Sequence, residues 1–126
     1  MSVIFTTSWD DGDILDLKLS RLLDHYGVKG TFYVPQKYRE NPLSEDNIRE
    51  IALRHEIGAH TLTHPDLHIL RNEEKKKEIC GSKEWLEKVI NKEVEMFCYP
   101  FGSYNKETAD IVKECGFNGA RTTEAG

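Results

Sequence analysis

Short apolar runs alternate with longer amphipathic stretches from one end of the chain to the other. The runs predict strands, and they occupy residues 3–9, 30–34, 56–59, 94–99 and 119–122. Parallel strands need a long crossover between them, which is usually a helix. The alternation therefore predicts parallel βαβ units.

The stretches between the runs have the start and stop signals of helices. A first helix over 15–26 is closed by Gly27, and Ser44 is a good N-cap for a second helix. A third begins near Asn72, and a fourth is capped by Asn105 and ends at Gly116. The apolar positions at helical spacing are Leu15, Leu19, Leu22 and Leu23, then Ile48, Ile51 and Ala52, then Ile79, Trp85, Leu86, Val89 and Ile90, and finally Ile111 and Val112. Gly81 weakens the middle of the third helix.

Five strands do not close a (β/α) barrel, which usually takes about 200 residues or more. A chain of 126 residues is therefore either an open α/β sheet or a piece of a longer protein, and we favour the piece. The expected fold is α/β, a single domain over 1–126 that forms the N-terminal portion of a parallel barrel-like fold. The unpaired outer edge of the last strand predicts self-association into a homo-oligomer or marginal stability.

Charge and hydropathy exclude several partners. The net charge is -5, and the 17 basic residues are spread along the chain, so neither nucleic acid nor an anionic membrane surface is an expected partner. The mean hydropathy of -0.59 leaves no membrane-spanning run. No signal peptide precedes the first strand, which predicts a cytoplasmic location by default.

The chain has three cysteines, Cys80, Cys98 and Cys115. Their number is odd and they form no CxxC pattern, so neither a disulfide framework nor a zinc knuckle is expected. We predict buried or unbridged thiols.

Polar clusters follow three of the predicted strands. Asp10, Asp11 and Asp13 follow the first, His60 and His64 follow the third, and an aromatic loop over 99–104 follows the fourth. The carboxyl ends of parallel strands gather on one side of an α/β fold, so these clusters are expected to meet in space.

The first two clusters have the residue types of a metal site. Adjacent carboxylates at Asp10 and Asp11 repel each other, and a cation would relieve that repulsion, although an acidic turn bent at Gly12 is the alternative. His60 and His64 are four residues apart, which predicts one face of a single helical turn and a shared metal. Two imidazoles and one carboxylate leave open positions on zinc or another divalent ion.

The other histidines are not expected to bind the metal. Pro65 disfavours a helical conformation at His64, so the turn should break before His68 joins it. His25 and His55 lie within helical stretches and are expected at the surface or at an edge, without a catalytic role.

In this order, the three clusters resemble the polysaccharide deacetylase family with the NodB homology domain, a group of metal-dependent carbohydrate esterases. The family's three motifs correspond here to Ser8-Trp9-Asp10-Asp11-Gly12, His60-Thr61-Leu62-Thr63-His64 and Cys98-Tyr99-Pro100-Phe101-Gly102. The resemblance implies hydrolysis of an N-acetyl group on a carbohydrate such as an N-acetylglucosamine polymer.

The resemblance also implies a role for each matched residue. Asp10 would be the general base, and Asp11, His60 and His64 the ligands of a divalent metal, zinc before cobalt, nickel or manganese. The backbone N–H of Phe101 would help to hold the oxyanion. The supporting or substrate-binding positions would be Thr61, which steadies the histidine loop, with Tyr99 and Pro100 of the third motif.

The chain departs from the family pattern in two ways. Cys98 stands where many members have an arginine that orients the catalytic aspartate, and we hypothesise that Arg121 substitutes for it. The two later motifs of the family are absent, and no histidine follows His68 to act as general acid. This predicts weak or no deacetylase activity for the chain as given, with metal binding retained.

Two other functions remain open at this point. One is a carbohydrate- or metal-binding module that derives from a deacetylase and has no activity. The other is a phosphatase of the haloacid-dehalogenase type, suggested by Asp11-Gly12-Asp13, which leaves His60 and His64 unexplained.

Overall fold

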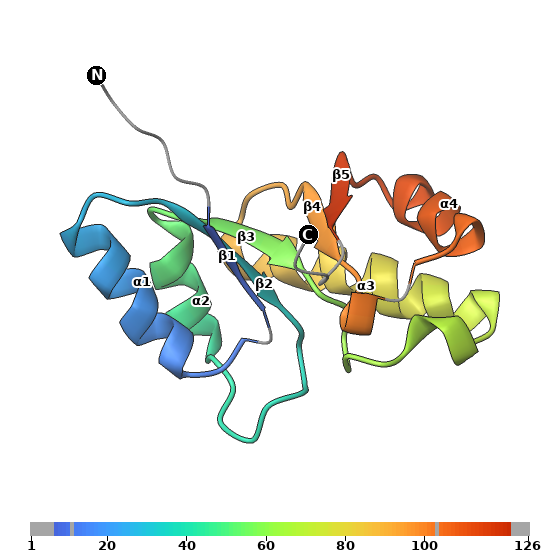
Figure 1. The fold of residues 1–126 in the computed structure, drawn as a ribbon, viewed down its shortest axis with the longest axis horizontal. Coiled ribbons are helices and arrows are strands. Elements are labelled where there is room, and N and C mark those ends of the chain that lie inside the picture. The colour runs from blue at the N-terminus through green and yellow to red at the C-terminus, as the bar shows by residue number, and fades with distance from the viewer. Residues whose placement is uncertain (1–6, 11, 103, 122–126) are drawn as a thin grey trace.

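The computed structural model describes residues 7–10, 12–102 and 104–121, and the side chains of all of these except residues 7 and 8. Its centre is a sheet of parallel strands (Figure 1). The strands are β1 (Thr7–Trp9), β2 (Gly30–Val34), β3 (Glu56–Ala59), β4 (Met96–Cys98) and β5 (Gly119–Arg121). Each pairs in parallel with its neighbours in the sequence, so β1 and β5 are the outermost strands of the described sheet.

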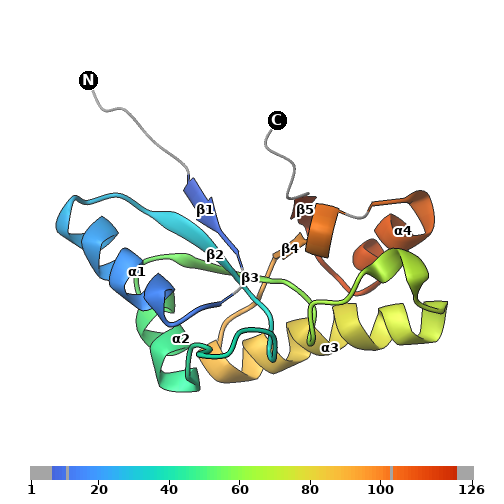
Figure 2. The same cartoon turned by 60° about the horizontal axis from the view of Figure 1, so that its bottom comes forward.

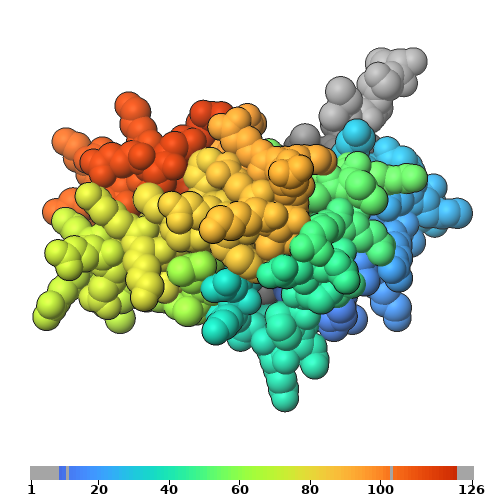
Figure 3. Space-filling model, turned by 180° about the vertical axis from the view of Figure 1, so that it is seen from behind, coloured from blue at the N-terminus to red at the C-terminus, as the bar shows by residue number. Residues whose placement is uncertain are grey.

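Helices connect the strands. They are α1 (Leu15–His25), α2 (Glu45–Ala52), α3 (Asn72–Ile90) and α4 (Lys106–Glu114), with short 3-10 helices η1 (Leu67–Ile69) and η2 (Pro100–Gly102). Because the strand order follows the chain order, right-handed crossovers carry the helices to one face of the sheet. Figure 2 shows α1, α2 and α3 below the strands. Seen from behind, most of the surface is formed by the segment from α2 to β4 and by α4 (Figure 3). This arrangement of strands and helices is the one expected for the predicted barrel-like α/β fold.

The two faces of the sheet differ in composition. The helix-facing positions include Phe32, Ile57 and Phe97, which are buried in the hydrophobic core together with residues of α2, α3 and α4. On the opposite face the ring of Tyr33 lies against Gly58, where a side chain would overlap the ring. Alternation along each strand thus separates the core from a second face that carries the polar strand ends.

The predicted element bounds agree closely with the structure. Strands 30–34 and 56–59 coincide with β2 and β3, whereas β4 and β5 are shorter than the runs 94–99 and 119–122. Residues 3–6 and 122 of the predicted strands lie outside the described residues. In α1, Leu15 and Leu22 are exposed, and the leucines that pack against the core are Leu17, Leu19 and Leu23.

The prediction that the cysteines are unbridged thiols is wrong for two of them. A disulfide joins Cys80 of α3 to Cys115 at the end of α4, with Cα atoms 5.1 Å apart. The two positions are 35 residues apart, and only the packing of α3 against α4 brings them together. Cys98 is a buried thiol in β4.

The prediction that His55 lies at the surface or at an edge is also wrong, because its side chain is buried between α1 and the sheet. Its Nδ1 accepts a hydrogen bond from the Gly30 N–H at 3.0 Å, so Nε2 carries the proton. That Nε2 donates to Asp24 Oδ1 at 2.8 Å and lies 3.2 Å from the Ser20 carbonyl oxygen. His55 is therefore a structural residue at the start of β2 and β3.

Within the described part of the chain, no helix combines the length and the apolar character needed to cross a lipid bilayer.

Candidate metal centre

Three side chains from different strands meet at the carboxyl end of the sheet. Asp10 follows β1, His60 follows β3 and Cys98 ends β4. Their potential ligand atoms all lie within 4.8 Å of one another. The predicted ligand Asp11 lies outside the described residues. The expected convergence of the first two polar clusters is thus visible through Asp10 and His60.

His60 and His64 face each other, although not in the predicted way. Both are buried, at 0% and 8% exposure, and their ring centroids are 4.6 Å apart. The expected helical turn is absent, because Thr61 and His64 have positive φ angles of 68° and 57°. A left-handed backbone at two positions turns the loop back on itself, and this brings the rings together. His68, in η1, is exposed.

A hydrogen bond fixes which nitrogen of His60 is available to a metal. Nδ1 lies 2.8 Å from the carbonyl oxygen of Cys98, which can only accept, so Nδ1 carries the hydrogen. The lone pair is therefore on Nε2, which is buried. A metal-binding imidazole usually donates its other N–H to a carbonyl or carboxylate in this way.

The loop between the two histidines is tied by Thr61. The buried Thr61 hydroxyl donates to the carbonyl oxygen of His60 and accepts from the His64 N–H at 3.0 Å. Across the loop, the N–H of Lys37 donates to the carbonyl oxygen of Leu62 at 2.7 Å. These bonds fix both histidines through the backbone.

Aromatic rings surround His64. The ring of Tyr38 stacks on it at a centroid distance of 3.8 Å and an angle of 14°, and the ring of Phe101 meets it edge-on at 4.9 Å. Phe101 has a positive φ of 59° and is largely exposed, like Tyr104 in the same loop. Tyr38 is not predictable from the sequence, because nothing in the loop after β2 indicates that it returns to the histidines.

The other predicted positions of the third motif lie deeper. Pro100 is buried. Tyr99 belongs to the helix-side core and contacts Phe97 and Tyr104 edge-on. Burial, with a smaller effect from Tyr104, raises the pKa of Tyr99 to about 12. Tyr99 therefore supports the aromatic loop over 99–104 from the core side.

Cys98 lies near Asp10, and Arg121 is its neighbour on the next strand. Cys98 Sγ is 3.9 Å from Asp10 Oδ1, and Arg121 is paired with Cys98 in the register of β4 and β5. Burial is the main reason that the pKa of Tyr33 rises to about 12; the nearby Cys98, Glu56 and Asp10 add to this effect, and Arg121 opposes it. The charges of Arg121 and Asp10 thus both act on Tyr33.

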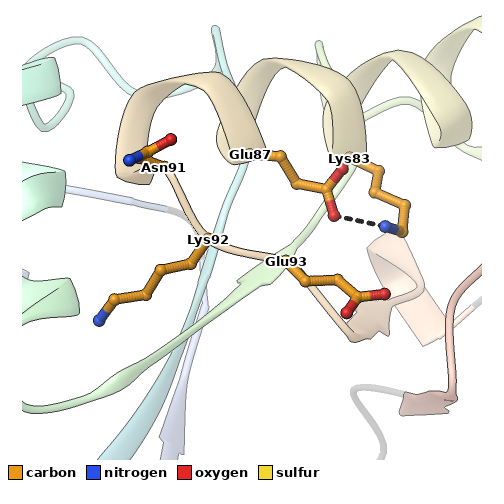
Figure 4. A pocket seen from close by; sticks show the side chains of 5 residues that line it. All are labelled: Lys83, Glu87, Asn91, Lys92 and Glu93. Atoms are coloured by element: carbon orange, nitrogen blue, oxygen red, sulfur yellow. Dashed lines mark hydrogen bonds and ion pairs between the residues drawn. The ribbon is translucent and has the colours of Figure 1, made fainter.

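A separate hollow of about 510 Å³ lies at the other end of the sheet, near the end of α3 (Figure 4). It is lined by Lys83, Glu87, Asn91, Lys92 and Glu93. An ion pair between Lys83 and Glu87 spans part of it. It contains none of the residues that converge at the carboxyl ends of the strands.

Comparisons with known proteins identify the family of the chain. The family model described as polysaccharide deacetylase matches residues 3–120. An uncharacterized protein of Bacillus subtilis (strain 168), YlxY, is 30% identical over 98 residues, covering 77% of this chain and 30% of its own length.

Two solved structures are similar throughout most of the chain. The deacetylase PplD of Streptococcus pyogenes, in complex with acetate, superposes with a TM-score of 0.83 at 25% identity, covering 88% of this chain and 52% of that one. The polysaccharide deacetylase BC0361 of Bacillus cereus has a TM-score of 0.83 at 29% identity, covering 94% of this chain and 40% of that one. This chain thus spans about half the length of these structures or less. Because the family model matches nearly all of this chain, the chain belongs to the polysaccharide deacetylase family.

Proposed function

We propose that this chain forms the metal-binding part of a site that hydrolyses N-acetyl groups on a carbohydrate such as an N-acetylglucosamine polymer. The observation that carries the proposal is the buried pair of His60 and His64, 4.6 Å apart by ring centroid, with ligand atoms of Asp10 and His60 within 4.8 Å of each other at the carboxyl ends of the strands. Membership of the polysaccharide deacetylase family supports the reaction class.

The residue types of the proposed donors suit a divalent cation. His60 Nε2, His64 and Asp11 would hold it, and imidazole with carboxylate suits zinc, with cobalt, nickel or manganese as alternatives. The hydrogen bond from His60 to the Cys98 carbonyl already sets the tautomer that this role requires. When bound, the cation would supply the Lewis acidity that activates water and polarises the amide carbonyl.

The remaining residues would transfer the proton and bind the substrate. Asp10 would take the proton from the attacking water. Cys98 Sγ lies 3.9 Å from its carboxylate, and Arg121, the neighbour of Cys98 on β5, would help to orient it. The backbone N–H of Phe101 would stabilise the oxyanion. The exposed rings of Phe101 and Tyr104 offer flat apolar faces for a sugar.

Acetate release from N-acetylglucosamine oligomers, with zinc supplied, tests this function. The variants are Asp10→Asn and His60→Ala, with His68→Ala as the matched control because His68 is exposed in η1. We expect the wild type and His68→Ala to release acetate only at the weak rate predicted from the sequence, and we expect this release to be lost in the other two variants. Binding of zinc without any acetate release would favour the non-catalytic module instead.

Association through β5 is a separate proposal. β5 is one of the two outer strands of the described sheet, and a second copy could pair with its edge. Sizing over a range of concentrations tests it: a concentration-dependent dimer supports the proposal, and a monomer at all concentrations contradicts it.

A further inference from the structure

The loop that carries the two histidines rests on α3. Glu78 of α3 accepts hydrogen bonds at Oε1 from the N–H groups of Leu62 and Thr63, at 3.0 Å and 2.9 Å. Its Oε2 accepts from the Thr63 hydroxyl at 3.0 Å. One carboxylate thus receives three hydrogen bonds from two of the three residues between His60 and His64.

Gly81, three residues further along α3, leaves space for the same loop. A Cβ at Gly81 would lie 3.1 Å from Leu62 Cδ1, closer than ordinary van der Waals contact, so the missing side chain makes room for Leu62. Residues three apart share a helix face. A glycine in the middle of a helix is otherwise unfavourable, and the approach of the loop explains its position.

The loop needs hydrogen-bond acceptors from α3 because its backbone is irregular. Thr61 and His64 adopt positive φ, and the N–H groups of Leu62 and Thr63 lie in neither a helix nor a strand. Glu78 provides the acceptors that secondary structure does not provide here. Charged acceptors bind N–H groups more strongly than neutral ones, so the carboxylate favours this conformation over more open ones.

We propose that Glu78 is a positioning residue that holds His60 and His64 in their metal-binding arrangement without touching the metal. The proposal rests on the proposed function, since it assumes that these imidazoles bind a cation. Residues that orient metal ligands typically change the metal affinity by about 10–100-fold when they are mutated.

Titration with Zn²⁺ alone tests the proposal in four chains: the wild type, Glu78→Ala, Glu78→Gln and Glu84→Ala. Glu84 is an exposed glutamate on the same helix and serves as the matched control. We expect Glu78→Ala to bind zinc about 10–100-fold more weakly and Glu84→Ala to bind like the wild type. Glu78→Gln keeps an oxygen that can accept both N–H groups, so it should bind more tightly than Glu78→Ala.

Hydrogen exchange of the Leu62 and Thr63 amides gives a second readout that needs no metal. Faster exchange at these two amides in Glu78→Ala, with the rest of the chain protected, is the expected result and also shows that the variant folds. Unchanged exchange, or zinc affinity in both Glu78 variants equal to that of the wild type, overturns the proposal.

His60→Ala separates this proposal from the proposed function. If the wild type binds zinc and His60→Ala does not, the metal site stands and the Glu78 variants decide the positioning role. If the wild type and His60→Ala are equally unable to bind zinc, the proposed function fails, and the positioning role fails with it. This holds even where the exchange result shows that Glu78 orders the loop.

Discussion

The imidazole of His60 donates through Nδ1 to the carbonyl oxygen of Cys98, 2.8 Å away on the neighbouring strand. The bond links the ends of β3 and β4 and leaves the buried Nε2 of His60 with its lone pair. Because the acceptor is a backbone atom, this orientation does not depend on the residue type at position 98. The presence of Cys98, where the family resemblance leads us to expect arginine, therefore does not change this hydrogen bond of His60.

Thr61→Val is expected to destabilise the fold. It removes the hydroxyl that accepts from the buried His64 N–H, and a buried donor left without an acceptor costs about 1–3 kcal/mol. Thr61→Ser keeps the hydroxyl and should lose less. The free energy of unfolding in urea measures both variants, and equal stability of the two would contradict the role given to the hydroxyl.

His55→Ala is expected to destabilise the fold by about 1–3 kcal/mol, since it leaves the buried Gly30 N–H without its acceptor. The exposed His25 is the matched control, and His25→Ala should change stability by about 0.5 kcal/mol or less. Thermal unfolding compares the two. His55→Ala should bind zinc like the wild type, because His55 lies at the start of the strands; a loss of zinc binding in the folded variant would contradict this assignment.

Glu87 is expected to make stability depend on pH in the acid range. Burial by itself raises the pKa of Glu87, but hydrogen bonds from Lys83 and the Val94 N–H, with the charge of Lys83, lower the pKa below its usual value on balance. The folded state therefore favours the charged carboxylate. This contribution is present above the unfolded-state pKa and is lost as the pH falls through the folded-state pKa.

The Glu87→Gln variant tests this pH dependence. It should be less stable than the wild type by about 1 kcal/mol at neutral pH, and the difference should shrink in acid. Glu93→Gln is the control, because Glu93 lines the same hollow but is exposed. A difference between Glu87→Gln and the wild type that stays constant down to acid pH would exclude the ionised carboxylate as its cause.

The sequence predicted the strands and helices well because their signals are local. The strands β2 and β3 are short apolar runs between turn residues, and the caps at Ser44 and Asn105 form as expected. The convergence of Asp10 with His60 followed from their positions after parallel strands. Such predictions need only short-range patterns and the topology of βαβ units.

The geometry of the site was less predictable because it depends on contacts between distant residues. The spacing of His60 and His64 suggested a helical turn, but the positive φ of Thr61 has no signal in the sequence. Glu78 is one of several glutamates on α3, and only the folded loop distinguishes it. The pairing of Cys80 with Cys115 likewise depends on the packing of α3 against α4.

The metal content of the purified chain, measured by elemental analysis after incubation with zinc and removal of the excess, tests the central claim most directly. The wild type and His68→Ala should retain a single zinc ion per chain, and His60→Ala and His64→Ala should retain none while keeping their fold. Equal zinc in all four chains, or none in the wild type, would contradict a metal centre built on His60 and His64.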